Sequence, residues 1–511
     1  MKYQNFLPRF ITKRINKYQK EKAIQKARND YNNKIAEFLK SSYVGVQEQN
    51  NSPELIVSLT SYPARIPYIK YTLYTLLMQS YKPNQILLWL SKEEFPKQEQ
   101  DLPQEILEFV KHGLTIKWCE KNIRSYKKLI PTLQEFPNSI IVTADDDVLY
   151  PQEWLSKLYE SYQSNPECIH CHRAHRILFD EKGEILPYNQ WRFEIPSNEA
   201  MPSVLNFGTT GGGILYPPNC FYQDVLKEDI FMNLAPTGDD IWFWVMAVLN
   251  GRKINVVGEN FKLGENYLID EKEVGSLWQH NKNGANDESV RRVFEKYPQL
   301  KEKVKFNSNE YWEIRYRIGG KAGSIGPSGA GSYNNLAVFK SEVLNEFVAE
   351  NNILEVLEFG CGDGNQLSYA KYPYYVGVDV SMTIVNRCRE IFAGDTTKQF
   401  YELQEFLKKP IKQFELCLSL DVIYHLIEDR VFEEYMKNLF EYSNKYVAIY
   451  ASNKNELWSS HVKHRKFSDW IENYYGESVR LVKIIPNKYP YDPKNPDYTS
   501  FADFYIYEKG K

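Results

Sequence analysis

The chain has 511 residues, which is more than a single hydrophobic core usually accommodates, so we expect at least two domains. Its 43% hydrophobic and 25% charged residues are ordinary for globular proteins and exclude collagen-like, coiled-coil and wholly disordered classes. The formal net charge of −3 gives the chain as a whole no electrostatic basis for binding nucleic acid. Seven cysteines without the spacing of a disulfide framework predict free thiols in a reducing compartment.

Residues 1–48 form a basic segment that predicts a helix. Between residues 2 and 40 there are eleven Lys or Arg against three acidic residues. The helix either packs on the following domain or lies on a membrane surface. In the second case four apolar side chains would enter the membrane surface: Phe6, Leu7, Phe10 and Ile11. No apolar run reaches 18 residues and no signal-peptide core is present, so we expect a cytoplasmic protein, with peripheral contact to the plasma membrane through this helix as the alternative.

Residues 49–304 start with an alternation of strand and helix patterns. The apolar runs LIVSLT, QILLWLS, LTIKWC and SIIVT are typical strands of βαβ units. The last of them leads directly into Asp145, Asp146 and Asp147. Ligands of open α/β sheets bind beyond the carboxyl ends of the strands, so these aspartates lie where chemistry is expected.

The three adjacent carboxylates repel one another unless a cation or protons neutralise them. We favour a divalent ion over a solvated acidic turn. Oxygen-only ligands select Mg²⁺ or Mn²⁺, and such an ion, held by one or two carboxylates, takes further ligands from substrate phosphates.

Two further features follow in the same domain. The run Gly211, Gly212 and Gly213 would let the backbone approach a bound sugar or phosphate, although a tight turn without a ligand is the alternative. Asp239 and Asp240 precede a strongly apolar helix, where acidic residues also serve as helix caps.

These motifs together resemble the GT-A fold glycosyltransferases of bacterial lipopolysaccharide and capsule clusters, over about residues 54–285. The resemblance implies a DxD motif in which Asp145 and Asp147 bind the metal and the nucleotide-sugar diphosphate, with Asp146 beside the substrate. It also implies a metal-ligating histidine near the end of the domain, for which His280 in SLWQHNKNG is the candidate, although a lone histidine is more often structural.

The same resemblance assigns roles to the second acidic pair. Asp240 would be the catalytic base that deprotonates the acceptor hydroxyl, and Asp239 would contact a sugar. The implied reaction is attack of that hydroxyl on the anomeric carbon, while the metal stabilises the departing diphosphate. A single base favours inversion.

A second α/β series occupies residues 305–511, after a charged and then Gly-rich seam. The segments ILEVLEFGCGDG, YYVGVDVS, FELCLSLDVIYHL and KYVAIYAS have the spacing of one Rossmann-like sheet. Gly360, Gly362 and Gly364 follow the first strand and would let the chain turn close to a nucleotide-like ligand. Asp379 ends the second strand, where a carboxylate can bind both ribose hydroxyls.

This E-x-G-x-G-x-G pattern departs from the NAD fingerprint and resembles the class I S-adenosylmethionine (SAM) methyltransferases, over about residues 310–460. The resemblance implies that Glu358, Gly360, Gly362 and Asp363, with Gly364 in the same loop, shape the methionine pocket. It further implies that Asp379 holds the ribose and that Asp421, in SLDVIYHLIED, lies beside the transferred methyl group.

Several histidines are candidates for the acceptor side of this second site. His425 would be the base if the acceptor is a hydroxyl, although a helix histidine packed near the pocket is an equal alternative. His461, His464 and Arg465, which follow the strand KYVAIYAS, form a second substrate-binding candidate, with a polar loop as the alternative. The segments YWEIRYRIGG and GPSGAGSYNN resemble the N-terminal lid of a methyltransferase subgroup, with a flexible linker as the alternative.

We therefore predict an α/β protein with a Rossmann-like GT-A domain and a Rossmann-like class I methyltransferase domain, preceded by a basic helix. The predicted function is bifunctional: transfer of a sugar from a nucleotide-sugar to a glycan or lipid-linked glycan, and SAM-dependent methylation of a sugar hydroxyl. In the alternative, only the methyltransferase is active, on a lipid or small metabolite, and the GT-A domain is a glycan-binding scaffold.

Overall fold

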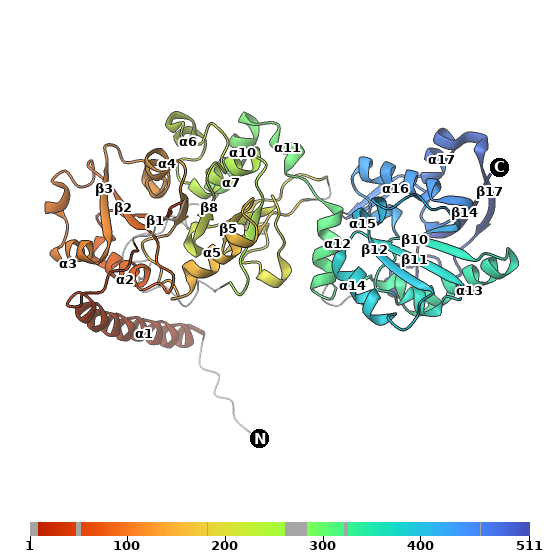
Figure 1. The fold of residues 1–511 in the computed structure, drawn as a ribbon, viewed down its shortest axis with the longest axis horizontal. Coiled ribbons are helices and arrows are strands. Elements are labelled where there is room, and N and C mark those ends of the chain that lie inside the picture. The colour runs from red at the N-terminus through yellow and green to blue at the C-terminus, as the bar shows by residue number, and fades with distance from the viewer. Residues whose placement is uncertain are drawn as a thin grey trace, which may run out of the picture. The chain divides into compact units, whose positions relative to one another are not determined.

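The computed structural model describes residues 9–47, 53–180, 182–260, 284–320, 325–459 and 461–510, with side chains from residue 24 onward. The chain separates into two compact units, residues 1–178 with 186–304 and residues 179–185 with 305–511. We call them unit 1 and unit 2. Each contains a seven-stranded, mostly parallel sheet flanked by helices, as expected for two α/β domains (Figure 1).

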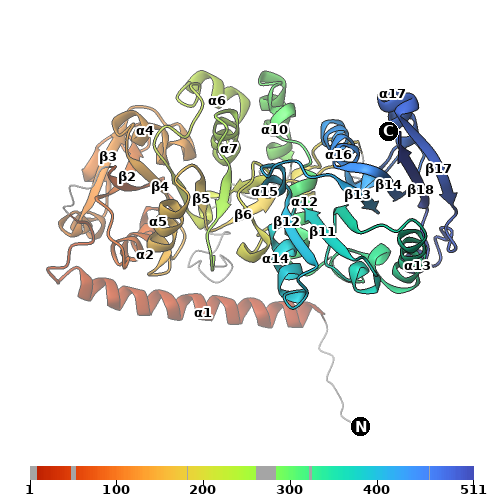
Figure 2. The same ribbon diagram turned by 45° about the vertical axis from the view of Figure 1, so that its right-hand side comes forward.

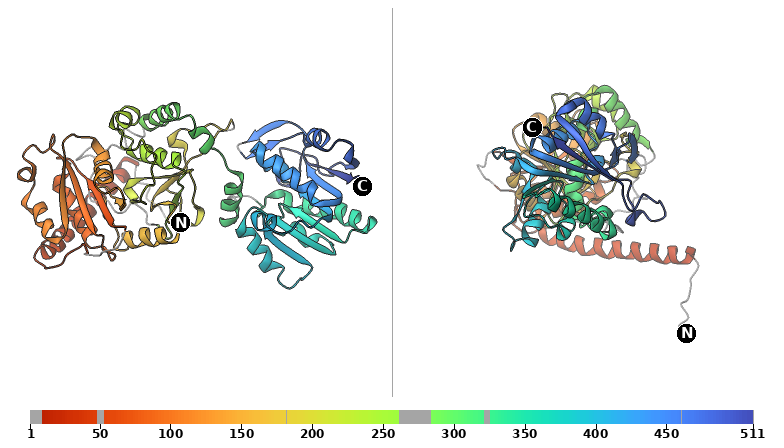
Figure 3. Two further views of the ribbon diagram at one scale, coloured as in Figure 1. Left: turned by 45° about the horizontal axis from the view of Figure 1, so that its top comes forward. Right: turned by 90° about the vertical axis from the view of Figure 1, so that its right-hand side faces the viewer.

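The sheet of unit 1 has the strand order β3-β2-β1-β4-β8-β5-β9. Its strands are β1 (Leu55–Thr60), β2 (Gln85–Ser91), β3 (Leu114–Cys119), β4 (Ile140–Thr143), β5 (Ile169–Cys171), β8 (Ile214–Tyr216) and β9 (Ile254–Val256). The parallel strands β1, β2 and β3, coloured orange, lie side by side in Figure 3. A small antiparallel pair joins β6 (Ala174–Arg176) to β7 (Asn206–Gly208). The four sequence-predicted strands are confirmed, and β4 ends just before the three aspartates.

Unit 1 also contains nine described helices outside the short 3-10 turns. They are α1 (Arg9–Phe38), α2 (Ile66–Leu77), α3 (Gln104–Glu108), α4 (Ile130–Glu135), α5 (Trp154–Ser164), α6 (Glu228–Leu234), α7 (Asp239–Leu249), α10 (Asn286–Lys296) and α11 (Leu300–Lys303). The main core lies where α2 and α5 pack against the buried strands, through residues such as Leu73, Leu88 and Leu155. Burial of these aliphatic side chains is the chief source of stability in such a layer.

The basic helix α1 packs against α2 with its C-terminal part (Figure 2). Ile35 and Phe38 are buried in the core of unit 1, and the Tyr71 hydroxyl donates to Asn32 at 3.2 Å. Of the two interpretations of the basic segment, packing on the following domain is therefore confirmed for this end of the helix. Phe6 and Leu7 lie outside the described residues, and within the described ones no helix has the length and apolarity to cross a membrane.

The sheet of unit 2 has the strand order β12-β11-β10-β13-β14-β18-β17. Its strands are β10 (Glu355–Phe359), β11 (Tyr374–Asp379), β12 (Lys398–Glu402), β13 (Phe414–Leu420), β14 (Ser443–Ala451), β17 (Val479–Ile485) and β18 (Asp503–Lys509). The first five are parallel, and β18 enters antiparallel between β14 and β17 (Figure 2). A separate hairpin pairs β15 (Glu456–Ser459) with β16 (Val462–His464).

The helices of unit 2 cover both faces of this sheet. They are α12 (Ser308–Arg317), α13 (Asn334–Glu350), α14 (Met382–Ile391), α15 (Leu403–Leu407), α16 (Asp429–Glu441) and α17 (Phe467–Tyr475). One core cluster contains Met436 and Phe440 of α16, and another contains Leu344 and Phe347 of α13. The strand order reverses direction at β10, which has β11 on one side and β13 on the other. Open α/β sheets bind ligands at such a switch point, beyond the carboxyl ends of the strands.

Candidate active sites

The three aspartates after β4 are not equivalent. Asp146 is 6% exposed; it accepts a 2.5 Å hydrogen bond from the Ser61 hydroxyl and pairs with Arg65 at 2.6 Å. The side chains of Asp145 and Asp147 are 30% and 20% exposed. The alternation along the chain thus turns Asp146 inward and leaves the two predicted metal ligands partly exposed.

A buried lysine joins this cluster to the second acidic pair. Lys128 ends the 3-10 helix η3 (Arg124–Lys128), and its Nζ lies 2.6 Å from Asp145 Oδ1 and 3.3 Å from Asp239 Oδ2. The Ser125 hydroxyl, from the same turn, donates to Asp239 Oδ1 at 2.8 Å. The two acidic motifs, about ninety residues apart in sequence, therefore meet at one ammonium group.

Asp240 has the environment of a base. It lies in the first turn of α7 and accepts hydrogen bonds from the backbone N–H of Thr210, at 3.2 Å, and from its hydroxyl. Burial, reinforced by the adjacent Asp239, raises the pKa of Asp240 to about 7, against the opposing effect of Lys128. A carboxylate with a pKa near neutrality is suited to accept a proton from a hydroxyl.

The charge balance of this site differs from the one expected from the sequence. The repulsion among the aspartates is relieved in part by protein cations, because Arg65 bridges Asp146 and Asp147 and Lys128 binds Asp145. Burial still raises the pKa of Asp147 to about 7, with the neighbouring aspartates adding to the effect and Arg65 opposing it. Five carboxylates thus face two cations, so the site keeps an excess of negative charge that a divalent ion can neutralise.

The remaining predicted metal ligand, His280, lies outside the described residues. Within the described part of the chain, no three or more His, Cys, Asp and Glu side chains are grouped so that they alone would hold a metal ion. Any ion here would thus depend on Asp145, Asp147 and ligands from a substrate, which is how Mg²⁺ is usually held.

The glycine run 211–213 is explained by packing within the protein. A Cβ on Gly212 would lie 2.5 Å from the Cβ of Arg173, and one on Gly213, where φ is +88°, would lie 2.4 Å from the ring of Trp154. Gly211 is buried in the same 3-10 turn, Thr210–Gly212. At Gly212 and Gly213 the protein itself therefore fills the space in the Cβ direction, and the approach of this backbone to a sugar or phosphate stays a prediction.

In unit 2, the three glycines after β10 are required by the backbone. Gly360, Gly362 and Gly364 have φ values of +81°, +60° and +77°, in the left-handed region that favours glycine. The loop lies beside the end of β11, where Asp379 accepts hydrogen bonds from the backbone N–H groups of Gly362, at 3.1 Å, and Ser381, at 3.0 Å. Burial raises the pKa of Asp379 to about 6.

A segment before the sheet covers this loop. Ser328 exchanges hydrogen bonds with Asp363: the Asp363 N–H donates to Ser328 Oγ at 2.9 Å, and the Ser328 N–H donates to Asp363 Oδ2 at 3.2 Å. The Tyr333 hydroxyl also donates to Asp363 Oδ2, at 2.8 Å, and the Tyr316 hydroxyl lies 3.3 Å from Ser328 Oγ. The packed arrangement supports the lid interpretation over the flexible linker.

Helix α12 is also fastened to the start of α14. Glu313 accepts hydrogen bonds from the hydroxyls of Ser381, at 2.5 Å, and Thr383, at 2.6 Å. Glu358, on β10, is buried and accepts a 2.7 Å hydrogen bond from the Tyr375 hydroxyl, and burial raises its pKa to about 7. Glu358 therefore binds another part of the protein, Tyr375 of β11, just before the glycine loop begins.

Asp421, directly after β13, is held in a strained conformation with φ of +59°. Its Oδ2 accepts from the Nζ of Lys340 at 2.7 Å, and its Oδ1 accepts from the Tyr424 hydroxyl at 2.7 Å. Lys340 comes from α13 and is 1% exposed. A Cβ on Gly331 would lie 2.6 Å from Asp421 Oδ2, so the lid segment also passes over this carboxylate.

His425, in the 3-10 helix η11 (Ile423–His425), has a defined tautomer. Its Nδ1 lies 3.2 Å from the carbonyl oxygen of His461 and must be the donor there, which leaves Nε2 as an acceptor. Burial lowers its pKa to about 4, so the ring is neutral at pH 7. Trp312 of the lid packs edge-on against it at 4.9 Å, and Tyr311 stacks on His461 at 5.1 Å.

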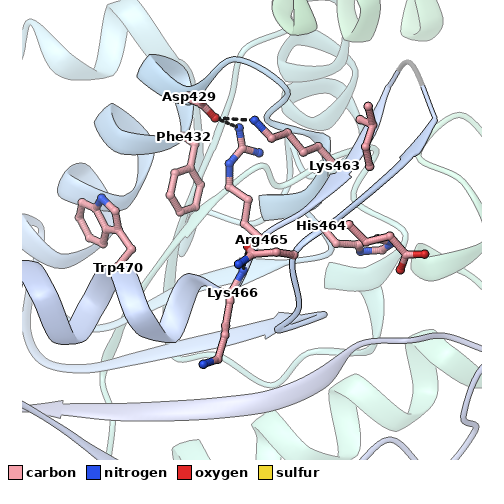
Figure 4. A pocket seen from close by; sticks show the side chains of 10 residues that line it. Asp429, Phe432, Lys463, His464, Arg465, Lys466 and Trp470 are labelled. Carbon is pink, nitrogen blue, oxygen red and sulfur yellow. Dashed lines mark hydrogen bonds and ion pairs between the residues drawn. The ribbon is translucent and has the colours of Figure 1, made fainter. Parts of the chain in front are cut away.

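His464 and Arg465 line an open pocket of about 380 Å³ (Figure 4). Arg465 is 7% exposed and is committed to structure: it binds the carbonyls of Leu426 and Ile427, the latter at 2.8 Å, and Asp429 at 2.6 Å. His464 is buried with its Nδ1 2.5 Å from the Ser452 hydroxyl. The guanidinium of Arg465 thus fastens the start of α16, and a role of His464 or Arg465 in substrate binding stays a prediction.

Sequence reasoning missed four cationic or covering groups of these sites. Arg65 follows β1 and could have been inferred from its place at the carboxyl end of a strand. Lys128 and Lys340 come from segments with no motif. Ser328 lies in the segment GPSGAGSYNN, which gave no sign of its contact with Asp363, so only the fold brings these three groups to the sites.

Comparison with models of known protein families gives no match, and comparison with curated proteins gives none. Among solved structures, the chain is similar to the methyltransferase domain of bacterial CtHen1, with 20% identity, 35% of this chain and 100% of that chain covered, and a TM-score of 0.28. The chain is also similar to the N-methyltransferase NodS of Bradyrhizobium japonicum WM9, with 12% identity, 35% of this chain and 99% of that chain covered, and a TM-score of 0.28. The comparison with WbdD bound to the kinase inhibitor LY294002 gives 19% identity, 35% of this chain and 41% of that chain covered, and a TM-score of 0.25.

Proposed function

We propose that unit 2 is a SAM-dependent methyltransferase that acts on a hydroxyl of a glycan. The observation that carries this proposal is the loop after β10, whose three glycines have positive φ values and whose Gly362 amide binds the carboxylate that ends β11. Each Asp379 oxygen keeps a lone pair that can accept a hydrogen bond from a ribose hydroxyl. The residues present therefore fit a nucleoside ligand at the switch point of the sheet.

When bound, SAM supplies an electrophilic methyl group on a sulfonium sulfur. The residues of the chain have to orient the acceptor and exclude water. The lid residues Tyr316, Ser328 and Tyr333 lie over the glycine loop, where they can exclude water. Asp421 carries no free negative charge, because Lys340 and Tyr424 bind its two oxygens, so we assign it to positioning. His425 Nε2 accepts the hydroxyl proton as the new bond forms.

We propose further that unit 1 transfers a sugar from a nucleotide-sugar to the same class of glycan, in surface polysaccharide or lipopolysaccharide synthesis. The convergence of two acidic motifs on Lys128 supports this. Asp145 and Asp147 would hold Mg²⁺ or Mn²⁺ with the diphosphate, and Asp240 would take the acceptor proton. Asp239, which Lys128 and Ser125 orient, would bind a sugar hydroxyl.

A thermal-shift experiment on the full chain tests both proposals. We expect SAM alone to stabilise the protein, and one class of nucleotide-sugar to stabilise it only with Mn²⁺. A ligand at a hundredfold excess over its Kd stabilises the native state by about 2.7 kcal/mol, which is readily measured.

Two variants make the result specific. Asp145→Asn should remove the Mn²⁺-dependent response and keep the SAM response, and Asp379→Ala should do the reverse. Asp101→Asn, at the end of an exposed turn of unit 1, is the control and should change neither. No response to SAM would contradict the methyltransferase, and a nucleotide-sugar response that survives in Asp145→Asn would contradict the metal site.

A further inference from the structure

Two chain segments at the carboxyl edge of the sheet of unit 2 meet beside the proposed methyl-transfer site. One is the hairpin β15–β16, which follows β14, and the other is the long connection 486–502 between β17 and β18. Since Ala451, at the end of β14, pairs with Asp503, at the start of β18, both segments leave the sheet at this edge. Connections of this length are uncommon in compact domains and are usually either functional or disordered.

The long connection is well ordered by internal hydrogen bonds. The Asn487 N–H donates to Asp503 Oδ1 at 2.7 Å, and the Asn487 side-chain amide binds the carbonyl of Ser500 at 3.0 Å. The Asp492 N–H donates to Thr499 Oγ1 at 3.1 Å. Such a framework holds the side chains of the connection in fixed positions.

These segments place exposed aromatic rings next to each other. Trp458 of the hairpin is 44% exposed and Tyr491 of the connection is 37% exposed. Their ring centroids are 5.8 Å apart with an interplanar angle of 88°, and Phe501 supports both, at 6.0 Å and 5.5 Å. Burial of two adjoining exposed rings against a ligand would be favourable, so they form a candidate binding surface.

The rings are continuous with the methyl-transfer site. Tyr424, whose hydroxyl binds Asp421, packs edge-on against Phe501 at 5.4 Å and lies 5.8 Å from His464. His464 in turn contacts Phe501 at 4.5 Å and Trp458 at 5.8 Å. A row of rings thus leads from Asp421 outward to Trp458 and Tyr491.

The edge of this surface is polar. Lys454 and Glu456 form a 2.5 Å ion pair, with side chains that are 47% and 43% exposed, and Lys454 Nζ lies 5.5 Å from the ring centre of Trp458. Glu456 also lines the pocket of Figure 4, together with Leu457. Aromatic faces with adjoining hydrogen-bonding groups match a pyranose, which has an apolar C–H face and a rim of hydroxyls.

We propose that Trp458 and Tyr491 form a saccharide-binding subsite that holds the acceptor glycan of unit 2. This inference rests on the proposed methyltransferase function and adds to it the surface that selects a glycan acceptor. The sugar next to the methylated one stacks on Trp458 or Tyr491, and Lys454 and Glu456 bind its hydroxyls.

Saturation-transfer difference NMR on the full chain tests the subsite, because it detects weak binding and reports which protons touch the protein. The probes are the methyl glycosides of mannose, galactose, glucose and rhamnose, each with SAM present. We expect saturation of the ring C–H protons of at least one sugar, reduced at least about fivefold in Trp458→Ala and in Tyr491→Ala. Trp458→Phe should retain most of it.

Tyr474→Ala is the matched control, since Tyr474 is 51% exposed but lies on α17, stacked on Trp470 at 4.9 Å. Calorimetric titration with SAM is measured on every variant and should be unchanged. Failure of SAM to bind the wild type would overturn the methyltransferase itself. If SAM binds, then an unchanged signal in Trp458→Ala, or no saturation of any of the four sugars, would overturn the subsite alone.

Discussion

The Nζ of Lys340 donates to Asp421 Oδ2 at 2.7 Å, and the lysine is 1% exposed. Removing one partner of a buried ion pair leaves an uncompensated charge, which typically costs about 3–5 kcal/mol. Lys340→Met should therefore lower the free energy of unfolding of unit 2 by about that amount, as measured by denaturant titration. The pair also holds Asp421 at positive φ, so methyl transfer should fall in the same variant.

A double variant separates charge from shape. Lys340→Met with Asp421→Asn removes both charges and should recover much of the stability, because no unpaired charge remains. If the double variant is as unstable as the single one, the ion pair is not the source of the loss. Methyl transfer should stay low in the double variant, since the amide that replaces the Asp421 carboxylate would lack the lysine that orients it.

Lys128 is expected to set the pH dependence of the proposed sugar transfer. Its charge lowers the pKa of Asp240, against the burial that raises that pKa to about 7. Lys128→Met removes the opposing effect, so the pKa of Asp240 rises further and less of the base is ionised at neutral pH. The acid limb of the kcat profile should therefore move to higher pH. The rate at pH 7 should fall by up to about tenfold for each pH unit that the limb moves.

The neighbouring Lys127 supplies the control. It is also buried, but it pairs with Glu94 and not with the aspartates of the site. Lys127→Met should reduce stability without moving the acid limb. An unmoved limb in Lys128→Met would show that Asp240 is not the base, or that Lys128 does not act on it.

The glycine run of unit 1 should respond to substitution as a packing element. Gly213→Ala places a Cβ 2.4 Å from the Trp154 ring at φ of +88°, so we expect a loss of about 3 kcal/mol or more in a denaturant titration. Gly251 has a similar φ, +77°, but open space around it, so Gly251→Ala should cost only about 1–2 kcal/mol. Equal losses in the two variants would contradict the packing explanation.

Much of the architecture could be predicted because its determinants are local. The runs LIVSLT and QILLWLS are apolar enough to define β1 and β2, and the glycines of GCGDG define a turn that no other residue adopts readily. The positions of Asp145, just after β4, and Asp379, the last residue of β11, followed from the same local pattern. Such features depend on consecutive residues, so they are visible in the sequence.

The partners of the site residues could not be predicted, because they come from distant segments. Lys128 reaches Asp239 across more than a hundred residues, and Lys340 reaches Asp421 across 81. Arg465 illustrates the converse: its charge suggested a substrate ligand, but its guanidinium binds backbone carbonyls and Asp429. A positively charged side chain can bind any nearby acceptor. The sequence does not show which acceptor the fold brings beside it.

Glu358 provides a test of burial through the pH dependence of stability. Its pKa is raised from the ordinary 4.5 to about 7 by burial beneath the glycine loop, so the folded state binds the proton more tightly than the unfolded state does. The stability that this proton provides is complete below about pH 4.5 and is lost as the pH rises through 7. Glu358→Gln keeps an oxygen that can accept from the Tyr375 hydroxyl and carries no charge.

The variant should therefore be more stable than the wild type at pH 8, by up to about 3 kcal/mol, and the difference should disappear near pH 4. Denaturant titrations of unit 2 across this range measure it. Glu355→Gln on the same strand is the control, since Glu355 forms only a surface ion pair with Lys412 and should show no such trend. A Glu358→Gln variant that is less stable at every pH would mean that the carboxylate is held charged by a group that binds it, and burial would not be the dominant effect.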